Sequence, residues 1–167
     1  MPLPPRMPQM QHVVINTQAG EEFGRRTGLP CHLVPNVMDF DKAPKPPDEY
    51  SRDFRESIGL ESDDIVILQP TRVVPRKGIE HAIELVQQLN DRRCKLVITH
   101  CSGDEGDAYA RRIRRYAEIM GVPVVFADEW IFHERETGPD GRKRYTVQDA
   151  YQHADFVTYP SSYYSEH

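Results

Sequence analysis

Thr71-Arg-Val-Val-Pro-Arg-Lys-Gly78 is the stretch that decides the fold, because it joins a buried strand to an amphipathic helix. The preceding run, Ile-Val-Ile-Leu at 65–68, has no polar alternation, which is typical of a parallel strand covered on both faces. The following helical pattern at 78–90 places five apolar residues on one face: Ile79, Ala82, Ile83, Val86 and Leu89. A strand, a turn and a helix in this order predict a βαβ unit.

The same alternation of strand and helix patterns continues on both sides of this unit. Apolar runs of strand length occupy 12–15, 31–35, 96–98, 124–126 and 156–159. Helical patterns occupy 18–27, 52–58, 107–120 and 146–153, and the first three end at Gly28, Gly59 and Gly121. Residues 128–144 are predicted to form a charged loop that turns at Gly138-Pro-Asp-Gly141. The chain is therefore predicted to be α/β, with a Rossmann-like parallel sheet and helices on both faces.

Composition excludes several classes of protein. The 167 residues include 21 basic and 26 acidic side chains, and this net charge of −5 argues against a nucleic-acid partner. The three cysteines, Cys31, Cys94 and Cys101, lack the spacing of a zinc site or a disulfide framework, so a reducing cytoplasm is expected. The longest apolar runs have strand length, and we expect no signal peptide and no integral membrane segment.

The turn 71–78 is the predicted binding site. In an open parallel sheet the ligand lies beyond the carboxyl ends of the strands, where loops lead into helix N-termini. Here the turn brings Arg72, Arg76 and Lys77 together with backbone N–H groups at Gly78. Arginine and lysine in such a place favour a diphosphate. Solvated loop charges are the alternative interpretation, which the position between strand and helix disfavours.

Three segments resemble motifs of one enzyme family. Val34-Pro-Asn-Val-Met-Asp39 resembles a P-N-G-V-D turn, and Thr71-Arg72 with Lys77-Gly78 resembles G-R-x-x-x-x-K-G. The segment Asp149-Ala-Tyr-Gln-His-Ala-Asp155, leading to Tyr159-Pro-Ser161, resembles D-A-Y-x-x-A-D…P-S. Together they resemble the retaining family-four (group 1) glycosyltransferases with two Rossmann domains, over nearly all of residues 12–164.

The resemblance implies a donor-binding domain and a reaction. The chain would be the C-terminal half of a two-domain glycosyltransferase that binds a nucleotide-diphosphate sugar, UDP- or GDP-linked. The full-length protein would transfer a hexose, with retention of configuration, to an unknown acceptor. A noncatalytic nucleotide-binding or interaction module that keeps the fold is the alternative hypothesis.

The resemblance also assigns roles at the turn. Arg72 and Lys77 would hold the donor diphosphate and stabilise the charge on the departing nucleotide, so no metal and no further cofactor are implied. Thr71 stands where the family usually has glycine, and its hydroxyl could donate to a phosphate. Gly78 would contribute backbone close to the donor.

Two loops are predicted to line the rest of the donor cleft. The loop His100-Cys-Ser-Gly-Asp104 follows a strand, and Gly103 is assigned to the cleft there rather than to a nucleophile site. After 124–126, Ala127, Asp128 and Trp130 are candidates for nucleoside contact. For Trp130 simple packing, and for Asp128 the capping of a turn, are the competing interpretations.

Other polar segments are given structural interpretations. Asn36 and Asp39 are expected to fix a turn between domains. The basic helix at 107–120 is expected to be a solvated outer helix packed through the stripe of Ile113, Tyr116 and Met120.

The predicted organisation is that of a partial domain. We expect a Pro-rich tail at 1–11, a segment at 12–49 joining from a missing N-terminal acceptor domain, a partial nucleotide-sugar-binding domain at 50–164, and a C-terminal end at 165–167. The family's Glu-Gly-Phe-Gly motif and its second glutamate do not follow Ser161, and Glu166 lacks that context. A truncated domain of this kind is expected to have little or no transferase activity by itself.

Overall fold

The structure, a computed structural model, describes residues 7–36, 41, 46–103 and 106–161. It divides into two compact units, Met1–Pro44 and Lys45–His167. The sequence-based division lies at 49 and 50. Each unit is described by itself below.

The first unit is a small βαβ arrangement. Strand β1 (Val13–Val14) pairs in parallel with β2 (His32–Leu33), and helix α1 (Thr17–Thr27) connects them. The Asn16 side chain caps α1 by accepting from the backbone N–H of Ala19 at 2.7 Å. Gly28 ends the helix with φ of 66°, as its position in the sequence predicts.

We expect fast amide hydrogen exchange throughout the first unit. Helix α1 contains no buried residue, and Val13, Ile15 and Leu33 are about half exposed. A parallel sheet normally has both faces covered, and a pair of two-residue strands buries too little apolar surface to be stable alone. Exchange measured by NMR or mass spectrometry should show α1 at least about tenfold less protected than β3 and β4 of the second unit. Equal protection of the two units would contradict this expectation.

The second unit is built on a four-stranded parallel sheet. Its strands are β3 (Ile65–Gln69), β4 (Cys94–Ile98), β5 (Val124–Phe126) and β8 (Phe156–Val157), in the order β5-β4-β3-β8. Alternate side chains of β3 and β4 enter separate cores on the two faces, which is why both strands are apolar throughout. The predicted Rossmann-like α/β fold is confirmed.

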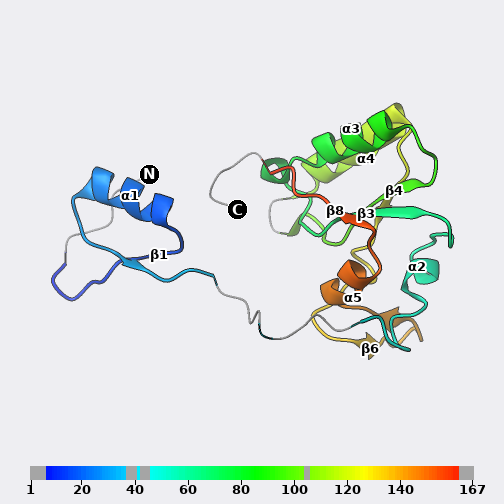
Figure 1. Ribbon diagram of the computed structural model, residues 1–167, viewed down its shortest axis with the longest axis horizontal. Coiled ribbons are helices and arrows are strands. Elements are labelled where there is room, and N and C mark those ends of the chain that lie inside the picture. Colours follow the sequence, from blue (N-terminus) through cyan, green and yellow to red (C-terminus); the bar gives the residue numbers. More distant parts are fainter. Residues whose placement is uncertain (1–6, 37–40, 42–45, 104–105, 162–167) are drawn as a thin grey trace. The chain divides into compact units, whose positions relative to one another are not determined.

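Helices cover both faces of this sheet (Figure 1). On one face α3 (Ile79–Leu89) and α4 (Ala108–Met120) pack over Ile67, Leu96 and Ile98. Ile113 of the predicted stripe is buried there, and Tyr116 and Met120 pack beside it. On the other face α2 (Phe54–Ser57) and α5 (Val147–Gln152) contribute to a core around Val66, Leu68 and Val97.

Two details of the sequence prediction are wrong. Leu89 was placed on the buried face of its helix but is 50% exposed. It lies in the last turn, where Asn90 in a left-handed conformation ends α3, and the core contacts end one turn earlier at Val86. The predicted charged loop at 128–144 contains a short antiparallel hairpin of β6 (Glu136–Thr137) and β7 (Lys143–Arg144). Strands of two residues are too short to show an alternating pattern.

Candidate functional site

The order of the strands fixes where a ligand can bind. From β3 the chain passes to β4 and β5 on one side, and β8 then returns to the other side of β3. Ligands of open α/β sheets bind outside the carboxyl ends of the strands at such a reversal. Two segments meet this condition, the turn 70–78 after β3 and the segment 158–161 after β8.

These two segments touch at a glycine. The turn after β3 ends in the short helix η1 (Pro75–Lys77), and Gly78 follows with φ of 60°. A Cβ atom placed on Gly78 would lie 2.2 Å from the carbonyl oxygen of Pro160. Only glycine allows both this backbone conformation and this close approach of two main chains. The K-G and P-S motifs, more than 80 residues apart in the sequence, therefore form one site.

Buried polar contacts hold the turn from below. Gln69, the last residue of β3, is completely buried, and its Nε2 donates to the carbonyl oxygen of Lys77 at 2.9 Å. The same nitrogen donates to Thr71 Oγ1 at 3.3 Å. Thr71 is only 6% exposed, and its backbone N–H donates to the carbonyl of Gln69 at 2.9 Å. The turn is thus fixed at both of its ends by one side chain that sequence reasoning missed.

The cations of the turn are half-buried and are held against the next loop. Val73 N–H donates to the carbonyl of Cys101 at 3.3 Å, which joins the turn to the loop after β4. Arg72 extends along this loop, because its Nη1 lies 3.6 Å from the Cβ position of Gly103. Arg72, Arg76 and Lys77 are each half-buried and take part in further interactions within the molecule. The predicted residues Thr71, Arg72, Lys77, Gly78 and Gly103 thus come from two adjoining loops.

A cavity of about 350 Å³ adjoins these loops between β5 and the first half of α4. Asp128 and Phe126 lie on its β5 side, and Arg114 lies on its α4 side. The guanidinium of Arg114 is 3.7 Å from the centre of the Phe126 ring, a cation–π contact. Trp130 lies elsewhere: it packs against the core on the α5 side, and its backbone pairs with Tyr145. Of the three nucleoside-contact candidates, Asp128 alone lines this cavity, and Ala127 is completely buried in the core on the α5 side.

His100 follows the carboxyl end of β4, which lies between β5 and β3 in the sheet. Its Nδ1 is hydrogen bonded to Thr99 Oγ1 at 2.6 Å. Burial lowers the pKa of His100 below its ordinary 6.5, and the positive charges of His133 and Arg72 lower it further, while Asp128 acts in the opposite direction. His133, Arg72 and Asp128 each therefore lie within electrostatic range of His100. His133 could not be found from the sequence, because it belongs to the charged segment that carries no periodic pattern.

We expect Arg72→Ala to raise the pKa of His100, measured by NMR titration of the imidazole carbons. His153 is the internal control, because burial and Arg55 lower its pKa and Arg72 is not among the causes. Because the folded pKa of His100 is below the unfolded value, the unfolded chain takes up the proton first as pH falls. The stability from neutral His100 is complete above pH 6.5 and declines below it. An unchanged His100 titration in Arg72→Ala would contradict the proximity of the two groups.

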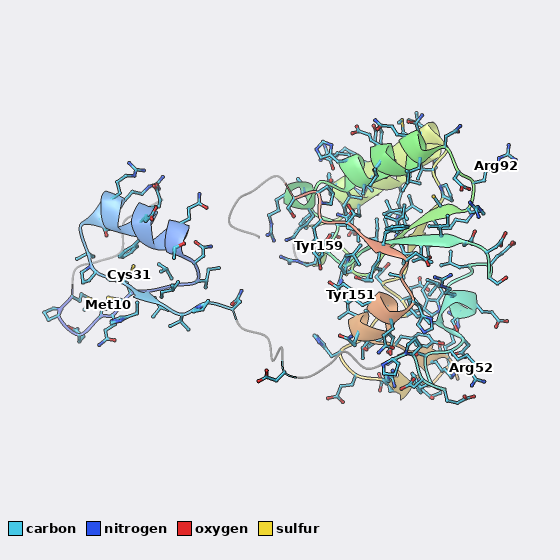
Figure 2. All side chains as sticks on the ribbon, viewed as in Figure 1. Met10, Cys31, Arg52, Arg92, Tyr151 and Tyr159 are labelled. Atoms are coloured by element: carbon cyan, nitrogen blue, oxygen red, sulfur yellow. The ribbon has the colours of Figure 1, made fainter. Side chains whose placement is uncertain are left out.

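Other features of the described residues lie outside this site. Arg92 and Tyr159, labelled in Figure 2, lie at opposite ends of the sheet. A second cavity, of about 640 Å³, adjoins Arg92 at the C-terminal ends of α3 and α4. The described residues contain no cluster of three or more His, Cys, Asp and Glu side chains that could hold a metal. No helix within the described ranges has the length and apolar composition of a membrane span. Asn36 is exposed, while Asp39, Asp104 and Glu166 lie outside the described residues.

Comparison with known proteins identifies two relatives, both named mannosylglucosylglycerate synthase. The protein of Thermotoga maritima is 34% identical over 174 aligned residues, covering 95% of this chain and 38% of the relative. The protein of Petrotoga mobilis is 31% identical over 180 aligned residues, covering 95% of this chain and 40% of the relative. No family model matches the chain, and no solved structure matches it significantly.

The chain spans about two fifths of the length of these relatives. The similarity nevertheless extends over both units, because it covers 95% of the chain. Along nearly its whole length the chain is therefore similar to part of two synthases that are glycosyltransferases.

Proposed function

We propose that this chain holds the nucleoside diphosphate of a sugar donor during glycosyl transfer. One observation carries the proposal. The cation-bearing turn after β3 meets the segment after β8 at Gly78 and Pro160, where the strand order reverses. This is the position at which open α/β sheets bind nucleotides. The similarity to two glycosyltransferases supports the same chemistry.

In the proposed complex Arg72 and Lys77 bind the two phosphates. Transfer of the sugar breaks the bond between its anomeric carbon and the diphosphate oxygen, and negative charge develops on the departing nucleotide. Two half-buried cations stabilise that charge more than solvated ones would, because less water screens them. The cavity beside Asp128 is the proposed place for the nucleoside, UDP or GDP, with Gly103 at its border.

We further propose that transfer occurs with retention of configuration, as in the family-four enzymes that the motifs resemble. The two relatives are named for the synthesis of mannosylglucosylglycerate. For a full protein containing this segment, we propose a mannosyl group as the transferred hexose and a polar glycoside acid as the acceptor. The acceptor-binding surface belongs to the part of such a protein that this chain does not match.

Calorimetric titration of the chain with UDP and with GDP tests the proposal. Arg72→Ala and Lys77→Ala are each expected to weaken binding by about 10- to 100-fold, because each removes a charged hydrogen bond to phosphate. Arg92→Ala is the matched control, since Arg92 is an exposed arginine at the opposite end of the sheet. Its affinity should equal that of the wild type.

Two results would contradict the proposal. Absence of binding of either nucleotide by the wild-type chain would favour a noncatalytic interaction module. Equal losses in Arg72→Ala, Lys77→Ala and Arg92→Ala would indicate nonspecific attraction of an anion to positive charge.

A further inference from the structure

We propose that Gln69 is a positioning residue that turns the hydroxyl proton of Thr71 toward the donor diphosphate. The inference rests on the proposed function and adds Gln69, a residue of the same site that no motif assigns. It depends on which atoms donate and which accept in the hydrogen bonds beneath the turn. The contacts of the buried Gln69 amide determine these roles.

The amide of Gln69 can have only one orientation. The carbonyl oxygen of Lys77 can only accept a hydrogen bond, so the atom 2.9 Å from it must be the amide nitrogen. The same nitrogen lies 3.3 Å from Thr71 Oγ1 and donates its second hydrogen there. Thr71 Oγ1 is therefore an acceptor toward Gln69, and its own hydrogen must point away from Gln69.

In the inferred arrangement, the hydrogen that points away from the buried Gln69 amide faces the outer side of the turn. Gln69 ends β3 inside the sheet, and Thr71 stands at the start of the turn that carries Arg72. At this place a glycine would offer only a backbone N–H to a phosphate. A threonine held as an acceptor from below instead offers an O–H donor, and hydrogen bonds to charged oxygens are the strong ones.

The amide oxygen of Gln69 indicates that the amide nitrogen is the functional atom of this side chain. Gln69 Oε1 is buried and has no hydrogen-bond partner among the residues that the structure describes. A buried acceptor without a donor is destabilising, and methionine or leucine in the same place would avoid that loss. The benefit of an amide at this position must therefore come from the two bonds that Nε2 donates, to Thr71 and to Lys77.

The test is a double-mutant cycle on the whole chain, with UDP, GDP and inorganic pyrophosphate as separate probes in calorimetry. Gln69→Met keeps the length of the side chain without the amide, and Thr71→Val replaces the hydroxyl by a methyl group of similar size. We expect Thr71→Val to weaken diphosphate binding about tenfold and Gln69→Met about fivefold. In the Thr71→Val background, Gln69→Met should weaken binding clearly less than it does in the wild type, because only its bond to the Lys77 carbonyl remains to be lost.

Two further variants keep the inference testable if Gln69→Met does not fold, as judged by circular dichroism. Gln69→Glu presents an acceptor to the Thr71 hydroxyl, so the hydroxyl hydrogen should point toward residue 69. This variant should weaken diphosphate binding at least as much as Gln69→Met is expected to. Thr71→Ser keeps a hydroxyl and should restore most of the affinity lost in Thr71→Val. A merely structural role of Gln69 would not produce the coupling between Gln69 and Thr71.

The outcomes separate this inference from the proposed function. If wild-type chain binds the probes but Gln69→Met binds equally well, the inference is overturned and the proposed function stands. If the losses in Gln69→Met and Thr71→Val multiply in the double variant, Gln69 does not act through Thr71, and the inference is likewise overturned. If wild-type chain binds no probe, the proposed function fails and the inference fails with it.

Discussion

Gly78→Ala is expected to lower the free energy of unfolding of the second unit by about 3 to 4 kcal/mol. Two effects combine. The backbone of Gly78 has φ of 60°, which a residue with a Cβ adopts only at a cost of about 1 to 2 kcal/mol. The added Cβ would also lie 2.2 Å from the Pro160 carbonyl oxygen, so one of the two main chains has to move. Urea unfolding followed by circular dichroism measures the change.

Gly121→Ala is the matched control for Gly78→Ala. Gly121 has nearly the same backbone conformation, with φ of 66°, but a Cβ there would meet nothing within 4 Å. It should lose only about 1 to 2 kcal/mol, from backbone strain alone. The difference between the two variants isolates the contact with Pro160. Equal losses would show that the segments after β3 and β8 do not meet as described.

The same substitution should also impair nucleotide binding. Moving either Gly78 or Pro160 shifts the two sides of the proposed diphosphate site relative to each other. Binding of UDP or GDP to Gly78→Ala should be at least about tenfold weaker than to wild type at a temperature where both are folded. Gly121→Ala, far along α4 from the turn, should bind normally.

Asp149→Ala is expected to lower the free energy of unfolding by about 3 kcal/mol. Asp149 is completely buried and forms an ion pair with Arg135, and its Oδ2 accepts from the Thr146 backbone N–H at 2.8 Å. The pair Thr146 and Asp149 forms the capping box of α5. Removing the carboxylate leaves Arg135 without its buried partner and the backbone N–H of Thr146 without its acceptor, which breaks one half of the capping box. Chemical unfolding at pH 7 measures the loss.

Asp48→Ala is the control, because Asp48 pairs with the same Arg135 but is exposed. An exposed ion pair contributes little, so this variant should change stability much less than Asp149→Ala. Burial by itself raises the pKa of Asp149, and the hydrogen bonds from Arg135 and Thr146 more than offset it, so the pKa lies below the ordinary 3.8. The contribution of Asp149 is therefore complete above pH 3.8 and is lost as pH falls through the lower, folded pKa. A larger loss in Asp48→Ala than in Asp149→Ala would contradict the burial of this network.

The elements of the second unit follow from local patterns. A strand buried on both faces is apolar at every position, which is the pattern of the run at 65–68. A helix buried on one face has apolar residues three or four apart, as at Ile79, Ala82, Ile83 and Val86. Gly121 and Thr146 mark helix ends through backbone conformation and side-chain hydrogen bonds that act within a few residues. The β6–β7 hairpin escapes prediction because its two-residue strands are too short to show alternation. The Tyr50 hydroxyl, which lies within hydrogen-bonding distance of the Glu136 and Arg144 carbonyls, comes from a distant part of the sequence.

The sequence by itself determined the α/β fold and the turn from Thr71 to Gly78, since both depend on patterns within about twenty residues. Only the tertiary structure decided which distant groups meet that turn. The contact of Gly78 with Pro160, the electrostatic effect of His133 on His100, and the packing of Trp130 away from the cavity all involve groups that are distant in the sequence. Likewise, the orientation of Gln69 beneath Thr71 and Lys77 becomes visible only when the turn closes over it. The physical reason is that side-chain periodicity records which face of an element is buried but not which other element covers it.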